Sequence, residues 1–341
     1  MDDRFQQIAV RTLTVSHPDL PAGFEGYRIL QITDLEGRRF GDRQQQLVEV
    51  IERQEFDMVL LTGDFVRQAE DFSDESLAPL VELLERLPGD VAKFYVLGSG
   101  EIPWAHGGSY AMVPSGRLRI MDVLEQHGFQ HVYPAAELTR GTDSIWLTGL
   151  ELSVLPGTDR PTEILDSSYV PLYPELEPEQ IRAFWQSAAA DGRASIETAA
   201  YRSDFELRAQ DFLERGDKDG FHILVSHRPA DFGYVGPPEL SFDELLQRRA
   251  EDPTLRLVDW EIIISGHTHG GLWRIPLIGP LIHPNIGLMP PDAVTYGLNP
   301  DKDGHRNVWI SSGLAAKQDW YASFRLFNPP EIAVLTLSAM P

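Results

Sequence analysis

The chain has 341 residues, with 29 Lys and Arg against 52 Asp and Glu, and a formal net charge of −23 at pH 7. This charge disfavours nonspecific binding to nucleic acid and to anionic lipid, so a role in binding duplex nucleic acid is excluded. Cysteine is absent, which excludes a disulfide framework and thiolate metal sites. A bound metal must therefore be held by carboxylates and imidazoles.

The N-terminal residues 1–5 lack the basic start and apolar core of a secretory signal, and no stretch reaches membrane-spanning length. We therefore expect a cytoplasmic protein. The sequence gives no indication of its oligomeric state.

In chain order, residues 8–14 alternate well enough to predict an opening strand. A second strand, residues 27–33, leads into Asp34 and Glu36. Apolar residues at helical intervals predict a helix over 43–54, and a strand then leads into Gly63 and Asp64. This strand–helix–strand unit places Asp34 and Asp64 side by side.

Further along, acidic residues 70–76 begin a second helix whose leucines line one face. A third strand over 92–97 ends in Gly98-Ser99-Gly100-Glu101. A helix over 120–127 and a strand over 144–150 follow. Residues 156–218, which are first Pro-rich and then acidic with a helical pattern, form an insertion that either caps the cleft or extends the surface.

In the second half, a strand over 221–226 leads into His227, and the apolar run 262–264 leads into Gly266-His267-Thr268-His269-Gly270-Gly271. Because open α/β sheets place their sites at the carboxyl ends of strands, we expect these junctions to converge on one cleft. Residues 277–289 are apolar and rich in Pro and Gly, which suits either a peripheral membrane contact or a loop packed on the core.

The alternation of strands and helices before residue 150, followed by strand-rich sequence, predicts an α/β (α+β type) fold. The expected architecture is a four-layer αββα sandwich of two mixed β-sheets flanked by helices. Strands over 308–310 and 332–337 are assigned to the second sheet. One site drawing on both halves indicates a single domain over residues 1–341, with the helical insertion at 156–218 inside it.

The ordered set Asp-x-Glu, Gly-Asp, Ser-His and Gly-His-Thr-His resembles the calcineurin-like metallophosphoesterase superfamily, especially its bacterial branch with Gly-His-Thr-His-Gly-Gly. The resemblance covers roughly residues 8–155 and 218–338. It implies a two-metal site with Asp64 as the bridging and catalytic carboxylate. The metal ligands that it implies are Asp34, Glu36, Asp64, Ser99, His227, His267 and His269.

The chain departs from the family pattern at three positions. Glu36 replaces a histidine, which favours Mn, with Mg, Fe or Zn as alternatives. Ser99 replaces an asparagine ligand, and Gly100 replaces the histidine that acts on the leaving group or the phosphate. Glu101 matches the acidic residue that closes this motif and, with Arg38, is a further predicted catalytic residue.

These features predict a phosphoesterase that hydrolyses a small phosphodiester or pyrophosphate by metal-activated water, with an activity impaired by Ser99 and Gly100. The alternative is a binding or scaffolding protein that keeps the fold and has lost turnover. A zinc hydrolase acting on amides or lactones is a minor third hypothesis, because the site has a large share of carboxylates.

Overall fold

A computed structural model gives the structure of the chain. It describes residues 7–67, 72–98, 100–101, 119–133, 135–153, 163–166, 177–191, 203–204, 207–208, 220–227, 229, 260–283, 287–289, 295–300, 307–316 and 325–340.

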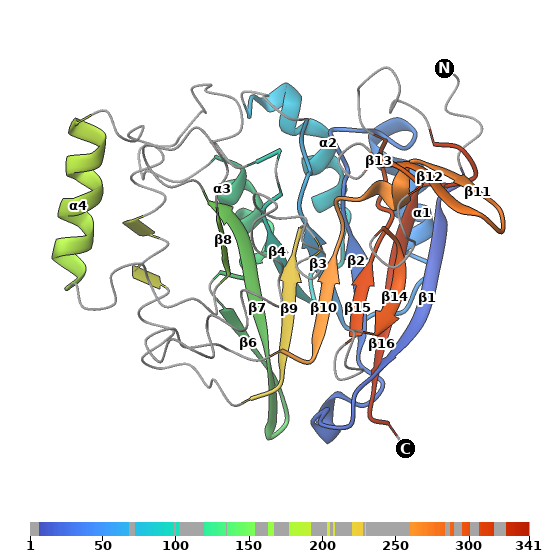
Figure 1. The fold of residues 1–341 in the computed structure, drawn as a ribbon, viewed down its shortest axis with the longest axis horizontal. Helices are drawn as coiled ribbons and strands as arrows, with labels where there is room; N and C mark the ends of the chain where they lie inside the picture. The colour runs from blue at the N-terminus through green and yellow to red at the C-terminus, as the bar shows by residue number, and fades with distance from the viewer. Residues whose placement is uncertain are drawn as a thin grey trace.

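Two mixed β-sheets lie at the centre of the molecule (Figure 1). The first has the order β1 (Ala9–Ser16), β16 (Glu331–Ser338), β2 (Arg28–Ile32), β3 (Met58–Thr62), β4 (Ala92–Val96) and β5 (Gln130–His131). The second has the order β14 (Gly297–Pro300), β15 (Asn307–Ile310), β10 (Ile262–Ser265), β9 (His222–Ser226), β7 (Asp143–Ser153) and β6 (Ala135–Arg140), with β8 (Glu163–Asp166) paired to β7. These sheets confirm the predicted α/β class.

The site-bearing strands are parallel within each sheet: β2 with β3, and β9 with β10. Alternate residues of β2 and β3 pack into two different hydrophobic cores. Ile29, Met58 and Leu60 pack between the sheets, whereas Leu30, Val59 and Leu61 pack under the helices. Burial on both faces explains why these strands are almost continuously apolar in sequence.

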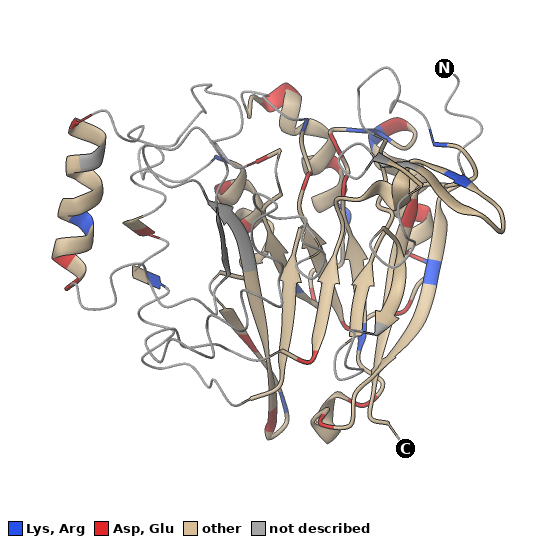
Figure 2. Cartoon of the chain, in the orientation of Figure 1, with Lys and Arg blue, Asp and Glu red and all other residues tan. Residues whose placement is uncertain are grey.

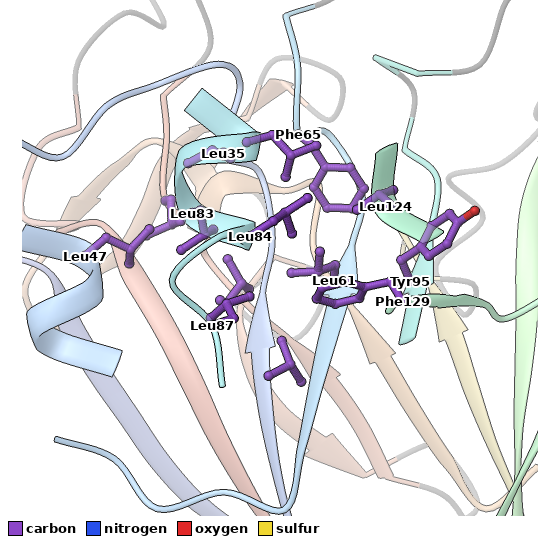
Figure 3. Close-up of a cluster of buried hydrophobic side chains, with 14 of the residues drawn as sticks. Leu35, Leu47, Leu61, Phe65, Leu83, Leu84, Leu87, Tyr95, Leu124 and Phe129 are labelled. Atoms are coloured by element: carbon purple, nitrogen blue, oxygen red, sulfur yellow. The ribbon is translucent and has the colours of Figure 1, made fainter. Parts of the chain in front are cut away.

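Helices α1 (Gln45–Ile51), α2 (Asp74–Leu84) and α3 (Arg119–Gln126) contribute apolar side chains to the core on the outer side of the first sheet. Figure 3 shows this cluster, in which Leu83, Leu84 and Leu124 meet Leu61 and Phe129. The outer side of the second sheet carries a smaller apolar cluster that includes Leu224, Ile263 and Val308. The described members of this cluster come from β9, β10 and β15 and from Trp260.

The assignment of residues 332–337 to the second sheet is wrong. β16 pairs in parallel with β1 and antiparallel with β2, inside the first sheet. The strand is apolar on both faces, as an interior strand of either sheet must be. The pattern therefore predicted the strand without predicting its sheet.

Within the insertion at 156–218, the structure describes β8, helix α4 (Pro178–Ala190) with its flanking residues 177 and 191, and residues 203–204 and 207–208. A capping box between Glu177 and Gln180 begins the helix, and Ile181 and Trp185 are its buried face. In Figure 1, α4 lies at the edge of the molecule beyond β7 and β8, away from the ends of β2 and β3. The helix itself is therefore not a lid over those strand ends.

A third, small antiparallel sheet consists of β11 (Trp273–Ile275), β12 (Gly279–His283) and β13 (Gly287–Leu288). It follows the short turn η4 (His269–Gly271). Short turns also occur at η2 (Ala22–Phe24) and η3 (Asp42–Gln44). No helix among the described residues is both long and apolar enough to cross a membrane.

Candidate metal centre

Six predicted ligands lie directly after four strands, two from each central sheet. The first sheet supplies carboxylates: β2 is followed by Asp34 and Glu36, and β3 by Asp64. The second sheet supplies imidazoles: β9 is followed by His227, and β10 by His267 and His269. The site therefore lies where the two sheets meet.

The backbone at this site is unusual, because five of these six residues have a left-handed conformation. The φ values are 54° for Asp34, 50° for Glu36, 52° for Asp64, 69° for His267 and 49° for His269. Each such conformation disfavours a residue with a side chain, by on the order of 1–2 kcal/mol. Backbone strain of this kind concentrates at functional sites, where the fold holds side chains in a required geometry.

One donor group consists of Asp64, His227 and His267. All three are buried, and their ligand atoms lie within 4.8 Å of one another. His227 Nε2 lies 3.0 Å from Asp64 Oδ2 and 3.0 Å from His267 Nδ1. A carboxylate and two imidazoles this close together form a donor set for a divalent cation.

A second donor group consists of Asp34, Glu36 and His269. His269 Nε2 lies 3.7 Å from Asp34 Oδ1 and 3.8 Å from Glu36 Oε1. Among the described residues, the buried Asp34 Oδ1 accepts no hydrogen bond. Its partner oxygen, Oδ2, accepts from the Thr33 hydroxyl and from the His267 N–H. The orphaned oxygen and the oxygen-rich donor set fit a hard divalent cation.

Main-chain carbonyls orient two of the imidazoles. His227 Nδ1 lies 2.8 Å from the Thr62 carbonyl oxygen, and His269 Nδ1 lies 2.9 Å from that of Ala315. A carbonyl can only accept, so each Nδ1 carries the hydrogen and each Nε2 faces the carboxylates when the ring is neutral. This is the second layer of contacts that commonly fixes histidine ligands.

Without metal, the buried charges shift one another's pKa values. Burial, reinforced by the Asp64 carboxylate, raises the pKa of Asp34 to about 6. Burial alone lowers the pKa of His227, but the carboxylates of Asp64 and Asp34 outweigh it and raise the pKa to about 9. The metal-free site therefore holds protons where a cation is expected.

The catalytic role of Glu101 stays a prediction, and the structure shows the contacts that its side chain makes. Its buried carboxylate accepts four main-chain N–H groups: those of Gly98 (2.7 Å) and Asp64 (2.9 Å) at Oε2, and those of Phe65 (2.6 Å) and Val66 (3.2 Å) at Oε1. Both carboxylate oxygens of Glu101 therefore accept hydrogen bonds from the main chain. Glu101 is therefore a positioning residue that fixes the loop carrying Asp64.

The other predicted residues near the site are placed as follows. Gly100 supplies no side chain, and its N–H donates to Asp64 Oδ1 at 2.7 Å. The Arg38 guanidinium lies 4.8 Å over the Phe40 ring, so its catalytic role stays a prediction. Ser99 lies outside the described residues.

Sequence reasoning missed the polar residues behind the site. The buried Arg325 side chain donates to the carbonyls of His269, Ser312 and Gly313. Asn328 also donates to the His269 carbonyl, at 2.6 Å. Neither residue lies in a strand with a recognisable apolar pattern, so the sequence carries no signal for these contacts.

Two adjoining groups of carboxylate and imidazole donors, at the strand ends of a two-sheet α/β fold, define a metal-binding protein of the hydrolase type. The chain belongs to the calcineurin-like phosphoesterase family, whose model matches residues 27–271. Membership supports a metal-dependent phosphoesterase in general.

Among individual proteins, the metallophosphoesterase YkuE of Bacillus subtilis, itself uncharacterized, is 22% identical over 333 residues, which are 96% of this chain and 84% of that protein. Two solved structures are also similar. Phosphopantetheinyl hydrolase of Mycobacterium tuberculosis is 16% identical, with a TM-score of 0.39 over 72% of this chain and 83% of that chain. A dimetal phosphatase of Danio rerio is 15% identical, with a TM-score of 0.38 over 85% and 88%. At such TM-scores, neither likeness carries a conclusion about activity.

Proposed function

We propose that this protein hydrolyses a phosphodiester or a pyrophosphate whose leaving group needs little protonation. The observation that carries the proposal is the gathering of six donors, five of them in left-handed backbone, into two groups of three at the strand ends. A fold that had lost the site would not need to hold five side chains in this strained conformation.

Each donor group supplies three side chains. Asp34, Glu36 and His269 would hold one cation, and Asp64, His227 and His267 the other, with Asp64 also available to the first. Two bound divalent cations lower the pKa of water and neutralise charge on the attacking and leaving oxygens of a phosphate ester. The carboxylate of Glu36 in place of an imidazole favours Mn or Mg at the first position.

The nature of the leaving group follows from Gly100. A glycine offers no proton to a departing oxygen, and loss of a positioned acid typically lowers rates by about 10²- to 10⁴-fold. Esters whose leaving oxygen is already a stable anion, such as an aryl oxide or a phosphate, avoid this penalty. The substrate class is therefore an activated phosphodiester or a pyrophosphate.

The test uses the full chain, stripped of metal by a chelator and reloaded with Mn. We expect hydrolysis of bis(p-nitrophenyl) phosphate that requires metal and is lost in Asp64→Asn. Glu137→Gln, an exposed strand carboxylate, is the matched control and should keep full activity. A protein that binds Mn tightly yet hydrolyses neither this ester nor a pyrophosphate would contradict the proposal.

That negative outcome favours the second candidate, a binding protein that kept the metal site. The specific observation behind it is the Gly100 position, where the main-chain N–H rather than a side chain faces Asp64. The two candidates make the same prediction for metal content and differ in turnover.

A further inference from the structure

Six large apolar side chains are exposed on and beside the small third sheet. They are Leu277, Ile278, Leu288, Met289, Leu326 and Phe327, which we call the apolar patch. Leu277 and Ile278 lie in the turn between β11 and β12, Leu288 of β13 pairs with Ile282 of β12, and Met289 follows it. Leu326 adjoins β11 through a bridge to Trp273.

Packing within the chain does not explain why these positions carry large apolar side chains. Leu277 is 108% exposed, Leu288 80% and Phe327 68%, so they bury little against the protein. Leu277, Met289 and Phe327 also have left-handed φ values of 71°, 49° and 52°, at which Gly or Asn is easier to accommodate. Both exposure and conformation disfavour large apolar residues here, which indicates a gain from contact outside the chain.

The surrounding charge shows what kind of contact this is. Although the chain has 52 acidic residues, none occurs between Glu261 and Asp292. Figure 2 shows β11–β13 without any Asp or Glu. The one Arg in this stretch, Arg274, is held at the base of the sheet by the Gly270 carbonyl and the Tyr296 ring. Insertion of β11–β13 into an apolar phase would therefore bury no carboxylate of these strands.

The shape and composition of the patch favour a lipid bilayer over a protein. Protein interfaces are enriched in aromatic residues, Met and Arg, whereas four of the six patch residues are Leu or Ile. In Figure 1, β11–β13 reach outward at the edge of the molecule. Ladder hydrogen bonds within the sheet satisfy much of the main chain that would enter the membrane.

We propose that the apolar patch inserts into the interfacial layer of a zwitterionic phospholipid bilayer. Apolar insertion drives binding, and the net charge of −23 opposes it near anionic headgroups. Binding should therefore be strongest on phosphatidylcholine. It should weaken when phosphatidylglycerol is added, and recover on those mixed vesicles as salt screens the repulsion.

The test is flotation of the full chain with phosphatidylcholine vesicles in a density gradient, at low and high salt. Leu277→Ser with Ile278→Ser should lower the partition coefficient by about 10-fold or more, because two exposed side chains lose their transfer into lipid. Met340→Ser is the matched control, since Met340 is half exposed and adjoins the C-terminus, which Figure 1 marks away from β11–β13. Circular dichroism of each variant confirms the fold.

Two results would overturn the proposal: no flotation of the unmodified chain at any salt concentration, or equal flotation of the double variant. Analytical sedimentation of both forms of the chain gives a third result that would overturn the proposal. If the unmodified chain is a dimer that the double variant dissociates, the patch is an interface between copies. None of these measurements depends on catalysis, so the result stands apart from the proposed function.

Discussion

Trp309 Nε1 donates a hydrogen bond of 2.6 Å to Gln31 Oε1, and this buried contact joins the second sheet to the first. The Gln31 amide group also donates to the Thr62 hydroxyl at 2.9 Å and to the Ser265 carbonyl at 3.1 Å. Gln31, Thr62 and Ser265 are two or three residues from Asp34, Asp64 and His267, respectively. The network therefore sets how the carboxylates of one sheet face the imidazoles of the other.

Replacing Gln31 with Leu should destabilise the protein by roughly 2–4 kcal/mol, because the buried Trp309 N–H and Ser265 carbonyl lose a partner. Urea unfolding of Gln31→Leu, Trp309→Phe and the double variant measures the coupling. Gln130→Leu, at an exposed strand position, is the control and should change stability by less than about 0.5 kcal/mol. Additive effects of the two substitutions would show that the contact is unimportant.

Glu101→Gln should weaken both the fold and metal binding. One acceptor oxygen becomes an NH₂ group that faces main-chain N–H donors, at a cost of roughly 2–4 kcal/mol. The loop carrying Asp64 then loosens, and Mn affinity should fall about 10- to 100-fold. Calorimetric titration and urea unfolding measure the two effects. Glu137→Gln should change neither, and an unaffected Glu101→Gln would exclude the positioning role.

The metal-free protein should lose stability as the pH rises from about 5 to 9. Burial, with Asp64, raises the pKa of Asp34 from 3.8 to about 6, and of Glu101 from 4.5 to about 7. The pKa of His227 rises from 6.5 to about 9, because the Asp64 and Asp34 carboxylates outweigh burial. All three groups bind protons more strongly in the folded state than in the unfolded chain, so deprotonation removes stability in each case.

We expect the Tm of the chelated protein to fall by roughly 5 °C or more over this range. Mn replaces the protons at the site, so stabilisation by Mn should increase with pH. Thermal scans of chelated and Mn-loaded protein between pH 5 and 9 test both statements. A chelated protein that becomes more stable with rising pH would contradict the assignment.

Metal occupancy should be uneven. The position with Asp34, Glu36, Asp64 and His269 keeps four side-chain donors, whereas the other keeps three described donors and the undescribed Ser99. Glu36→His should lower Mn content in favour of Zn or Fe, because an imidazole replaces a hard oxygen donor. Elemental analysis measures this, with Glu49→His on α1 as the exposed control. Equal occupancy of both positions at low added Mn would contradict the prediction.

Ser99→Asn combined with Gly100→His should raise the phosphodiesterase rate by about 10- to 1000-fold, within the range that one ligand and one acid group contribute. The two single variants separate these contributions. Steady-state kinetics on bis(p-nitrophenyl) phosphate with Mn measures the gain. A folded, Mn-loaded double variant that stays inert would favour the binding protein over the enzyme.

The fold class and the position of the donors were predictable from sequence. An apolar run predicts a strand, and a polar motif directly after it lies at the carboxyl end of that strand. The sheet that contains β16 was not predictable, since an interior strand has the same apolar pattern in either sheet. The main-chain contacts of Glu101 and the hydrogen bonds of Gln31 were not predicted either. A carboxylate beside metal ligands looks the same in sequence whether it faces the substrate or main-chain N–H groups.

β16 lies in the interior of the first sheet, hydrogen-bonded to β1 on one side and β2 on the other. During synthesis, β1 and β2 therefore have no shared neighbour until residues 331–338 have left the ribosome. A nascent chain that stalls earlier exposes two open strand edges, which are sites of aggregation. The sheet that carries Asp34 and Asp64 closes only then, so we expect metal capture to follow the emergence of β16 from the ribosome.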